Sequence, residues 1–196
     1  MAKIKASFNG TKKDAIIQSA AALFRHKGYK ASSMRELAEA IGVEAPSLYN
    51  HIGSKGELLE AICFKVAGDF TDNLQSIESS PESSVKKIEQ LIRFHIHIML
   101  QEYDEVYVAN YEWKHLAEPF LADFLTQRKL YEKRMMQLIK EGIERKELKD
   151  LHPQVAVLTI LSAVRGIEFW QRHKTAISPK ELEENMVDHL LNGLIA

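Results

Sequence analysis

Apolar residues recur at the spacing of an α-helix along nearly the whole sequence, and Pro or Gly falls between the segments that they form. The alternation of apolar and polar residues that marks a half-buried strand is almost absent. The 196 residues are enough for one large domain or two small ones with a substantial buried core. The sequence therefore predicts an all-α protein.

Start and stop signals bound the expected helices. Three capping boxes of the form Ser-x-x-Glu begin at Ser33, Ser54 and Ser178. Gly28 and Gly42 are placed to end two of the helices. We expect about nine helices, over residues 11–27, 33–40, 45–51, 54–75, 82–101, 104–115, 118–146, 153–173 and 179–194.

Charge is distributed unevenly along the chain. Through residue 56, nine Lys and Arg stand against four acidic residues, a net charge of +5, whereas the other 140 residues carry −6. A basic N-terminal part on an acidic body suggests that only the N-terminal part meets a polyanion. The alternative is that these are ordinary solvated surface charges whose uneven distribution has no functional meaning.

The stretch 45–55, "APSLYNHIGSK", has few side chains to bury, yet Pro46 stands where a helix begins. The preceding short helix ends at Gly42, so two short helices are joined by a tight turn. This is the pattern of a helix-turn-helix unit, whose second helix enters the major groove of DNA. Leu48, with Val43 and Ile52, would anchor that helix and leave its other face polar.

Residues 32–62, "SSMRELAEAIGVEAPSLYNHIGSKGELLEAI", resemble the N-terminal DNA-binding region of the TetR family of transcriptional repressors. The preceding "ALFRHKGYKASS" is similar to the first helix of that family and its Phe-x-x-x-Gly-Tyr ending. The resemblance implies a three-helix DNA-binding domain over residues 1–54 and an effector-binding and dimerisation domain over residues 55–196.

The resemblance also implies roles for single residues. Ser33 and Arg35 would contact a phosphate and a base at the start of the second helix, since Arg to guanine is the commonest base contact. Ala45, Pro46, Ser47 and Asn50 would lie on the exposed face of the recognition helix. The positions that contact phosphate in the family correspond to Tyr49, His51 and Lys55.

Each of these residues also has a plainer interpretation. Tyr49 could be a core residue, His51 a structural histidine and Arg35 a solvated surface charge. Ala45 and Pro46 are apolar for base-reading positions and would contact thymine methyl groups or nothing. On charge alone, an N-terminal arm against the DNA backbone could be formed by Lys3, Lys5, Lys12 and Lys13.

The remaining 140 residues are more than a DNA-binding unit needs. The resemblance implies a homodimer that reads a palindromic operator in double-stranded DNA, with a four-helix bundle from the last two helices of each subunit. The apolar seams of that bundle would be supplied by Val155, Leu158, Leu161, Ser162, Val164, Leu182, Met186, Leu190 and Leu194. Ordinary core is the alternative, and periodicity does not separate the two.

Aromatic residues with a few polar groups among them concentrate in the middle of the chain, as in a ligand pocket. The residues expected to bind a small-molecule effector are His95, Tyr107, Tyr111, Phe124, Arg128, Tyr131, Arg165, Phe169 and Trp170. An aromatic core would give the same pattern.

Residues 107–175 are similar to TetR-like repressors that respond to acyl-CoA or steroid-CoA thioesters. Such a ligand would need an apolar tunnel and cations for its phosphates. The candidate cations are Arg128, Lys133, Arg134, Arg165 and Arg172. The alternatives are a drug, a steroid or a free fatty acid as effector, a DNA-binding protein without an effector, or an activator in place of a repressor.

Enzyme chemistry finds no support in the sequence. It has no Gly-x-Ser-x-Gly and no phosphate-binding glycine loop, and Cys63 falls in an apolar register. His95 and His97 point to different sides of a helix, and the Glu112-x-x-His115 pair has no second copy to complete a di-iron site. We expect no catalytic residues, no cofactor and no metal.

One Cys allows no internal disulfide. No signal peptide and no run of about 18 apolar residues is found, so no membrane partner is expected. A cytoplasmic location is expected.

Overall fold

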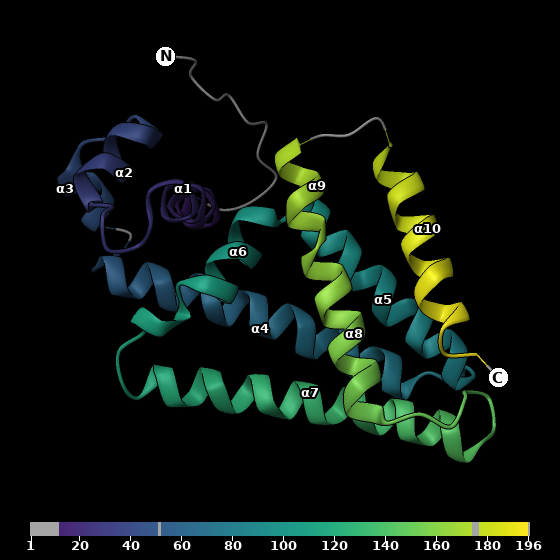
Figure 1. Ribbon diagram of the computed structural model, residues 1–196. Helices are drawn as coiled ribbons and strands as arrows, with labels where there is room; N and C mark the ends of the chain where they lie inside the picture. Colours follow the sequence, from purple (N-terminus) through teal and green to yellow (C-terminus); the bar gives the residue numbers. More distant parts are fainter. Residues whose placement is uncertain (1–11, 51, 174–176, 196) are drawn as a thin grey trace. The chain divides into compact units, whose positions relative to one another are not determined.

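The computed structural model describes residues 12–50, 52–173 and 177–195, and all regular elements within these ranges are helical (Figure 1). Extended backbone pairs there in a single bridge, between Leu148 and Ile195. For the described part of the chain, the all-α prediction is confirmed.

The elements follow one another in the order α1 (Lys12–Lys27), α2 (Met34–Ile41), α3 (Ala45–Tyr49), α4 (Lys55–Ser79), α5 (Ser84–Gln101), α6 (Tyr103–Tyr111), the 3₁₀ helix η1 (Trp113–His115), α7 (Phe120–Glu144), α8 (Pro153–Arg165), α9 (Ile167–His173) and α10 (Pro179–Asn192). Their ends lie within four residues of the expected ones, the largest difference being α4, which continues to Ser79. At two places a single expected helix is divided.

The helix expected over residues 153–173 is divided at Gly166 into α8 and α9. The Gly166 N–H donates to the carbonyls of Ser162 and Ala163, at 3.2 and 3.0 Å, so the chain tightens there. A Cβ at this position would lie 2.9 Å from the carbonyl oxygen of Ala163, which explains why glycine suits the break. The helix expected over 104–115 similarly ends at Tyr111 and continues as the 3₁₀ turn of η1.

The predicted helix signals act as expected at most positions. Ser33 and Ser178 form complete capping boxes, and Gly28 and Gly42 are left-handed, with φ of 85° and 74°. Ser54 forms half of its box. Its hydroxyl accepts the N–H of Glu57, whose carboxylate accepts the N–H of Gly53 instead of that of Ser54.

Contacts divide the chain into two compact units, Met1–Val66 with Asp104–Phe124, and Ala67–Tyr103 with Leu125–Ala196. We call them the head unit and the body unit. The expected domain boundary at residue 54 stays a prediction, since the compact units do not test it.

In the head unit, α1 packs on α2 and α2 packs on α3. Phe24, Leu37, Leu48, Leu58 and Ile62 lie in its core, each 1% exposed or less. Side chains of the segment 104–124 also contact the rest of this unit. Arg25 of α1 forms an ion pair with Asp104, and the ring of Phe64 contacts those of Phe120 and Phe124.

In the body unit, α5 is central, because α8, α9 and α10 all contact it (Figure 1). Its buried stripe contains Ile88, Leu91, Ile92 and Ile96. Polar contacts between helices surround this core. Arg134 of α7 donates two hydrogen bonds to the Glu78 carboxylate, at 3.1 and 2.5 Å, and Arg93 joins Glu89 to Glu183 of α10.

Glycine is required by packing at one position in α7. A Cβ added to Gly142 would lie 2.6 Å from Cδ1 of buried Leu148 and 3.0 Å from Cβ of Ser84. We expect Gly142→Ala to destabilise the protein by about 1–3 kcal/mol through overpacking, measured as the free energy of unfolding in urea. Gly68→Ala in α4 is the matched control. Apart from its chain neighbours and the backbone of α4, no atom of the described residues lies within 4 Å of its added Cβ, so helix propensity should stabilise this variant by about 0.5–1 kcal/mol. Stabilisation of both variants would contradict the packing argument.

Candidate functional site

The α2–turn–α3 region of the head unit forms a rigid corner. Gly42 caps α2 in the left-handed conformation, and its N–H donates to the carbonyls of Ala38 and Glu39. The N–H of Val43 also reaches Ala38, at 3.0 Å. Leu48 and Ile52 are each 1% exposed, so α3 is anchored through one apolar face, as predicted.

The other face of α3 is open. Pro46, Tyr49 and Asn50 are exposed, and Ala45 and Ser47 are half-buried. The Tyr49 side chain is 52% exposed, which excludes the alternative of a core tyrosine and leaves its phosphate contact a prediction. His51 lies outside the described residues, as do Lys3 and Lys5 of the expected arm. The other two arm residues, Lys12 and Lys13, are exposed at the start of α1.

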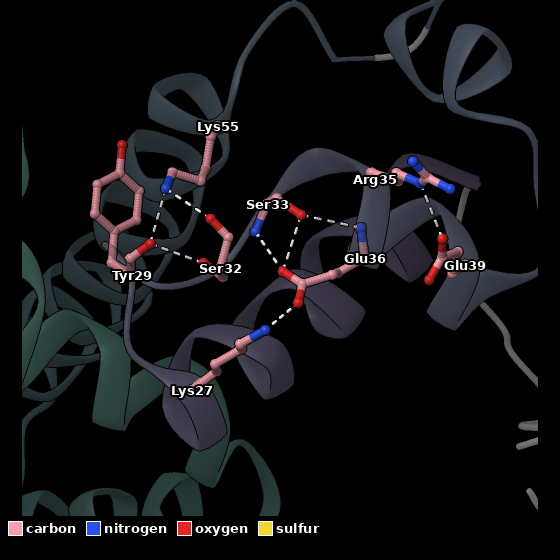
Figure 2. A network of polar contacts seen from close by, with 8 residues as sticks. All are labelled: Lys27, Tyr29, Ser32, Ser33, Arg35, Glu36, Glu39 and Lys55. Atoms are coloured by element: carbon pink, nitrogen blue, oxygen red, sulfur yellow. Dashed lines mark hydrogen bonds and ion pairs between the residues drawn. The ribbon is translucent and has the colours of Figure 1, made fainter.

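Ser33 at the start of α2 is exposed but already bonded. Its hydroxyl accepts the N–H of Glu36 at 3.3 Å and donates to the Glu36 carboxylate at 2.9 Å (Figure 2). Lys27 of α1 forms an ion pair with the same carboxylate, and this contact lowers the pKa of Glu36 below its ordinary value. The entry of α2 is therefore tied to the end of α1.

Arg35 projects from α2 into solvent, with a side chain 85% exposed. Its Nε donates to Glu39 one turn later, at 3.2 Å (Figure 2). An exposed pair of this kind is worth at most about 1 kcal/mol, so Arg35 can leave it for a base. The geometry allows the predicted base contact, and the alternative of a solvated charge stays open.

Lys55, by contrast, is half-buried and occupied. Its ammonium donates to the carbonyl oxygens of Tyr29 and Ser32, at 2.9 and 2.8 Å, and lies 4.5 Å from the centre of the Tyr29 ring (Figure 2). Two of its three N–H bonds are therefore used within the protein. We call these contacts the Lys55 clamp.

Tyr29 holds a central place that sequence reasoning missed. Its ring packs edge-on against Phe24, with centroids 5.2 Å apart, and stacks on His115 at 5.5 Å. Burial raises the pKa of Tyr29 and lowers that of His115. In the sequence, Tyr29 was noticed only as part of the Phe-x-x-x-Gly-Tyr ending of the first helix, and no function was predicted for it.

The expected effector residues fall into both units. In the body unit, His95 of α5 is 5% exposed, and its Nε2 lies 2.8 Å from the Tyr131 hydroxyl of α7. Phe70 contacts both rings, at 4.7 and 5.8 Å. Burial, then the charge of Arg165, lowers the pKa of His95 to about 3, and burial raises that of Tyr131. This cluster is therefore polar, buried and neutral at pH 7.

Two buried polar atoms of the body unit have no hydrogen-bond partner within the described ranges. They are Nε1 of Trp170 in α9 and Oδ1 of Asn73 in α4. Sequence reasoning named Trp170 but not Asn73. Because a buried unpaired polar group is costly, these atoms are candidates for bonds to a ligand.

The other expected effector residues differ in burial. Arg128 is half-buried, whereas Arg165 and Phe169 are exposed. Tyr107, Tyr111 and Phe124 belong to the head unit, where the two tyrosine rings lie 4.6 Å apart and Phe124 is buried against Phe64. Of the remaining candidate cations, Arg134 pairs with Glu78, Lys133 is exposed, and the side chain of Arg172 lies outside the description.

The expected dimer seam also divides. Val164, Leu190 and Leu194 are buried inside the body unit. Leu161, Leu182 and Met186 are half-buried, whereas Ser162 is exposed together with the apolar Val155 and Leu158. Val155 and Leu158 are 58% and 63% exposed, so one part of the seam is core and another faces outward.

Features of other protein classes are few. Cys63 is buried in the apolar core, as its apolar register predicts. In the described ranges, no three His, Cys, Asp or Glu gather where they could hold a metal ion. Nε2 of His115 lies 3.4 Å from Oε2 of Glu112, and both side chains are largely enclosed. None of the helices in the same ranges is long and apolar enough to cross a bilayer.

Comparison with known proteins gives two family matches. Residues 16–62 match the model for bacterial regulatory proteins of the tetR family, and residues 81–194 match the model for the tetracyclin repressor-like C-terminal domain. The HTH-type transcriptional repressor KstR2 of Mycolicibacterium smegmatis is 28% identical over 138 residues, which cover 68% of this chain and 65% of that relative.

Two solved structures are similar in fold. The ketosteroid transcriptional regulator KstR2 of Mycobacterium tuberculosis has a TM-score of 0.87 at 19% identity, over 97% of this chain and 98% of its own. AibR in complex with isovaleryl coenzyme A and operator DNA has a TM-score of 0.80 at 23% identity, over 92% of this chain and 98% of its own. At these identities the two structures inform on fold alone.

Proposed function

Because the chain belongs to the TetR family of bacterial regulatory proteins, we propose that it is a homodimeric transcriptional repressor released from its operator by a small apolar effector. The observation that carries this proposal is the α2–turn–α3 corner, with Leu48 buried and Arg35, Tyr49 and Asn50 open to solvent. Such a corner suits insertion of a short helix into the major groove.

Dimerisation is supported by the apolar residues that α8 and α9 expose. Val155, Leu158 and Phe169 are 58%, 63% and 68% exposed, although an apolar surface of this kind is usually covered in a soluble protein. A twofold dimer would read a palindrome whose half-sites lie about 34–36 Å apart, one turn of DNA.

We propose an acyl-CoA thioester as the effector. The complex of AibR with isovaleryl coenzyme A supports this class by analogy of fold. In this chain, the neutral pair His95–Tyr131 with Phe70 offers an apolar setting with hydrogen bonds, and Trp170 Nε1 and Asn73 Oδ1 need partners. Arg128 and Arg165 would attract the phosphates of CoA. A drug, a steroid or a free fatty acid is the second candidate, and the neutrality of this cluster favours an uncharged member of that group.

Release would follow from a population shift. The effector must bind the arrangement of heads that cannot hold DNA more tightly than the arrangement that can, because a ligand with equal affinity for both shifts nothing. The same scheme serves an activator, since the sign of regulation depends on where the operator lies relative to the promoter.

The deciding experiment is fluorescence anisotropy of the purified protein on labelled DNA from upstream of its own gene. Fatty-acyl and aryl CoA thioesters are then titrated into the complex, with free acids, steroids and drugs as a second panel. Tight, salt-sensitive binding released by a thioester supports both parts of the proposal. Release by the second panel alone would overturn the thioester, and no DNA binding would overturn the repressor.

Arg35→Ala is expected to weaken operator binding by about 1–3 kcal/mol and to relax base preference at one position of each half-site. The reason is loss of a base contact, and the measurement is anisotropy on a set of single-base operator variants. Tyr49→Phe is the control for a backbone contact and should weaken binding to all variants alike. Unchanged base preference in Arg35→Ala would make that residue a solvated charge.

A further inference from the structure

The Lys55 ammonium already has partners within the head unit, whereas an ammonium that binds a phosphate would be expected to face solvent. Two carbonyl oxygens, 2.9 and 2.8 Å from its ammonium, accept hydrogen bonds, and the Tyr29 ring lies 4.5 Å away. Hydrogen bonds from a charged donor are among the stronger ones in proteins. To bind a phosphate through the full ammonium, Lys55 would have to leave these partners.

The two carbonyls belong to the connection between α1 and α2. Tyr29 O also accepts the Ser32 hydroxyl at 2.8 Å and the Ser32 N–H at 3.4 Å. Ser33, the N-cap of α2, follows directly. The clamp therefore joins the first residue of α4 to the turn in which α2 begins, across 26 and 23 residues of sequence.

Tyr29 itself cannot move freely, because its ring lies against both Phe24 and His115. The turn is thus fixed on one side by aromatic packing and on the other by the ammonium of Lys55. Arg35 is the second residue of α2, so its direction depends on the orientation that this turn imposes on the start of the helix. The Arg35 side chain is 85% exposed, so packing against neighbouring side chains does little to set its direction.

We propose that Lys55 is a positioning residue, which orients α2 and thereby aims Arg35 at its base, and that it does not serve as a phosphate contact. The inference rests on the proposed binding to operator DNA. It assigns to Tyr29 and Ser32, through their carbonyls, a part in sequence recognition although neither is expected to touch DNA.

Charge and position separate the two roles of Lys55. The logarithm of the binding constant falls linearly with the logarithm of the salt concentration, and loss of one phosphate contact makes this slope shallower by about 0.9 per subunit. Loss of the clamp should leave that slope unchanged and lower affinity by about 5- to 150-fold, the worth of a base contact that is no longer aligned. We therefore expect Lys55→Met to bind operator weakly at every salt concentration with the slope of the unmodified protein.

Lys55→Arg is the second variant, and it keeps the charge. The guanidinium fits a phosphate at least as well as an ammonium, but it is longer and planar and does not fit between the two carbonyls and the Tyr29 ring. We expect Lys55→Arg to lose affinity as Lys55→Met does. Circular dichroism checks that both variants are folded, and the arginine variant suffices if the methionine variant is not.

A double-mutant cycle with Arg35→Ala distinguishes positioning from general weakening of the fold. If the clamp acts through Arg35, Lys55→Met should cost less than threefold in the Arg35→Ala background. If the losses of affinity in Lys55→Met and Arg35→Ala add fully in the double variant, the inference is overturned. It is also overturned if Lys55→Met makes the salt slope shallower by about 0.9 per subunit while Lys55→Arg binds with normal affinity. If the unmodified protein bound no operator, the proposed function would fail instead.

Discussion

The Leu158→Glu variant is expected to sediment as a monomer in analytical ultracentrifugation. It should also bind its operator about 10²- to 10⁴-fold more weakly than the unmodified protein. Two linked DNA-binding heads gain about that factor in affinity, because binding of the first raises the effective concentration of the second at its half-site. Leu158 is 63% exposed on α8, where Val155 and Ser162 lie one turn away on either side. In a dimer this face would be covered, and a buried unpaired carboxylate is costly.

Leu130→Glu is the matched control. Leu130 is 52% exposed on α7, outside the seam that is expected from the last two helices. Its variant should remain dimeric with nearly normal affinity. A dimeric Leu158→Glu protein would remove α8 from the interface, and the exposed apolar face would then need another partner.

The expected dimer seam shows the limit of what sequence periodicity can predict. Val164 and Leu158 belong to the same apolar pattern of α8, yet Val164 is 3% exposed and Leu158 is 63% exposed. Periodicity identifies an apolar face but does not tell whether the same chain or a second copy covers it. Six residues of α-helix place Leu158 and Val164 about 120° apart, so the side of α8 that packs within the body unit takes Val164 and leaves Leu158 outside.

Helix boundaries were predicted well where the signal was local. The capping boxes at Ser33 and Ser178 and the left-handed Gly42 depend on residues within one turn, so the sequence contains all that is needed. The break at Gly166 was not predicted, because the apolar pattern continues across it. A lone glycine inside such a pattern does not by itself mark an end.

The candidate sites were predicted less completely than the helix boundaries, because they depend on contacts between residues far apart in the sequence. Exposure of Tyr49 and anchoring by Leu48 follow from one short helix and its turn. The Lys55 clamp and the His95–Tyr131 bond join residues 23 to 36 positions apart. No local pattern relates such residues, so sequence reasoning named His95, Tyr131 and Lys55 but not the contacts that decide what each can do.

Acid is expected to destabilise the protein through His95. Burial holds its pKa at about 3 in the folded state, against an ordinary value of 6.5. Between these values the unfolded chain binds a proton that the folded protein does not, so stability is lost as pH falls from about 6.5. The slope should approach about 1.4 kcal/mol per pH unit, which gives about 3 kcal/mol by pH 4.5.

Urea unfolding at pH 7 and pH 4.5 measures this loss, and the comparison with His95→Phe isolates the contribution of one group. That variant cannot be protonated at position 95, so its stability should fall less between the two pH values by about 3 kcal/mol. It should also be less stable at pH 7, because the Tyr131 hydroxyl loses its partner.

His97→Phe is the control, since His97 is exposed two residues further along α5. It should keep the full acid sensitivity of the unmodified protein. Equal acid sensitivity in His95→Phe would mean that His95 takes up its proton without unfolding, through an opening of the body unit that admits water beside Tyr131. The pair would then be accessible to a charged ligand group, and the preference for an uncharged one, which rests on its burial, would no longer hold.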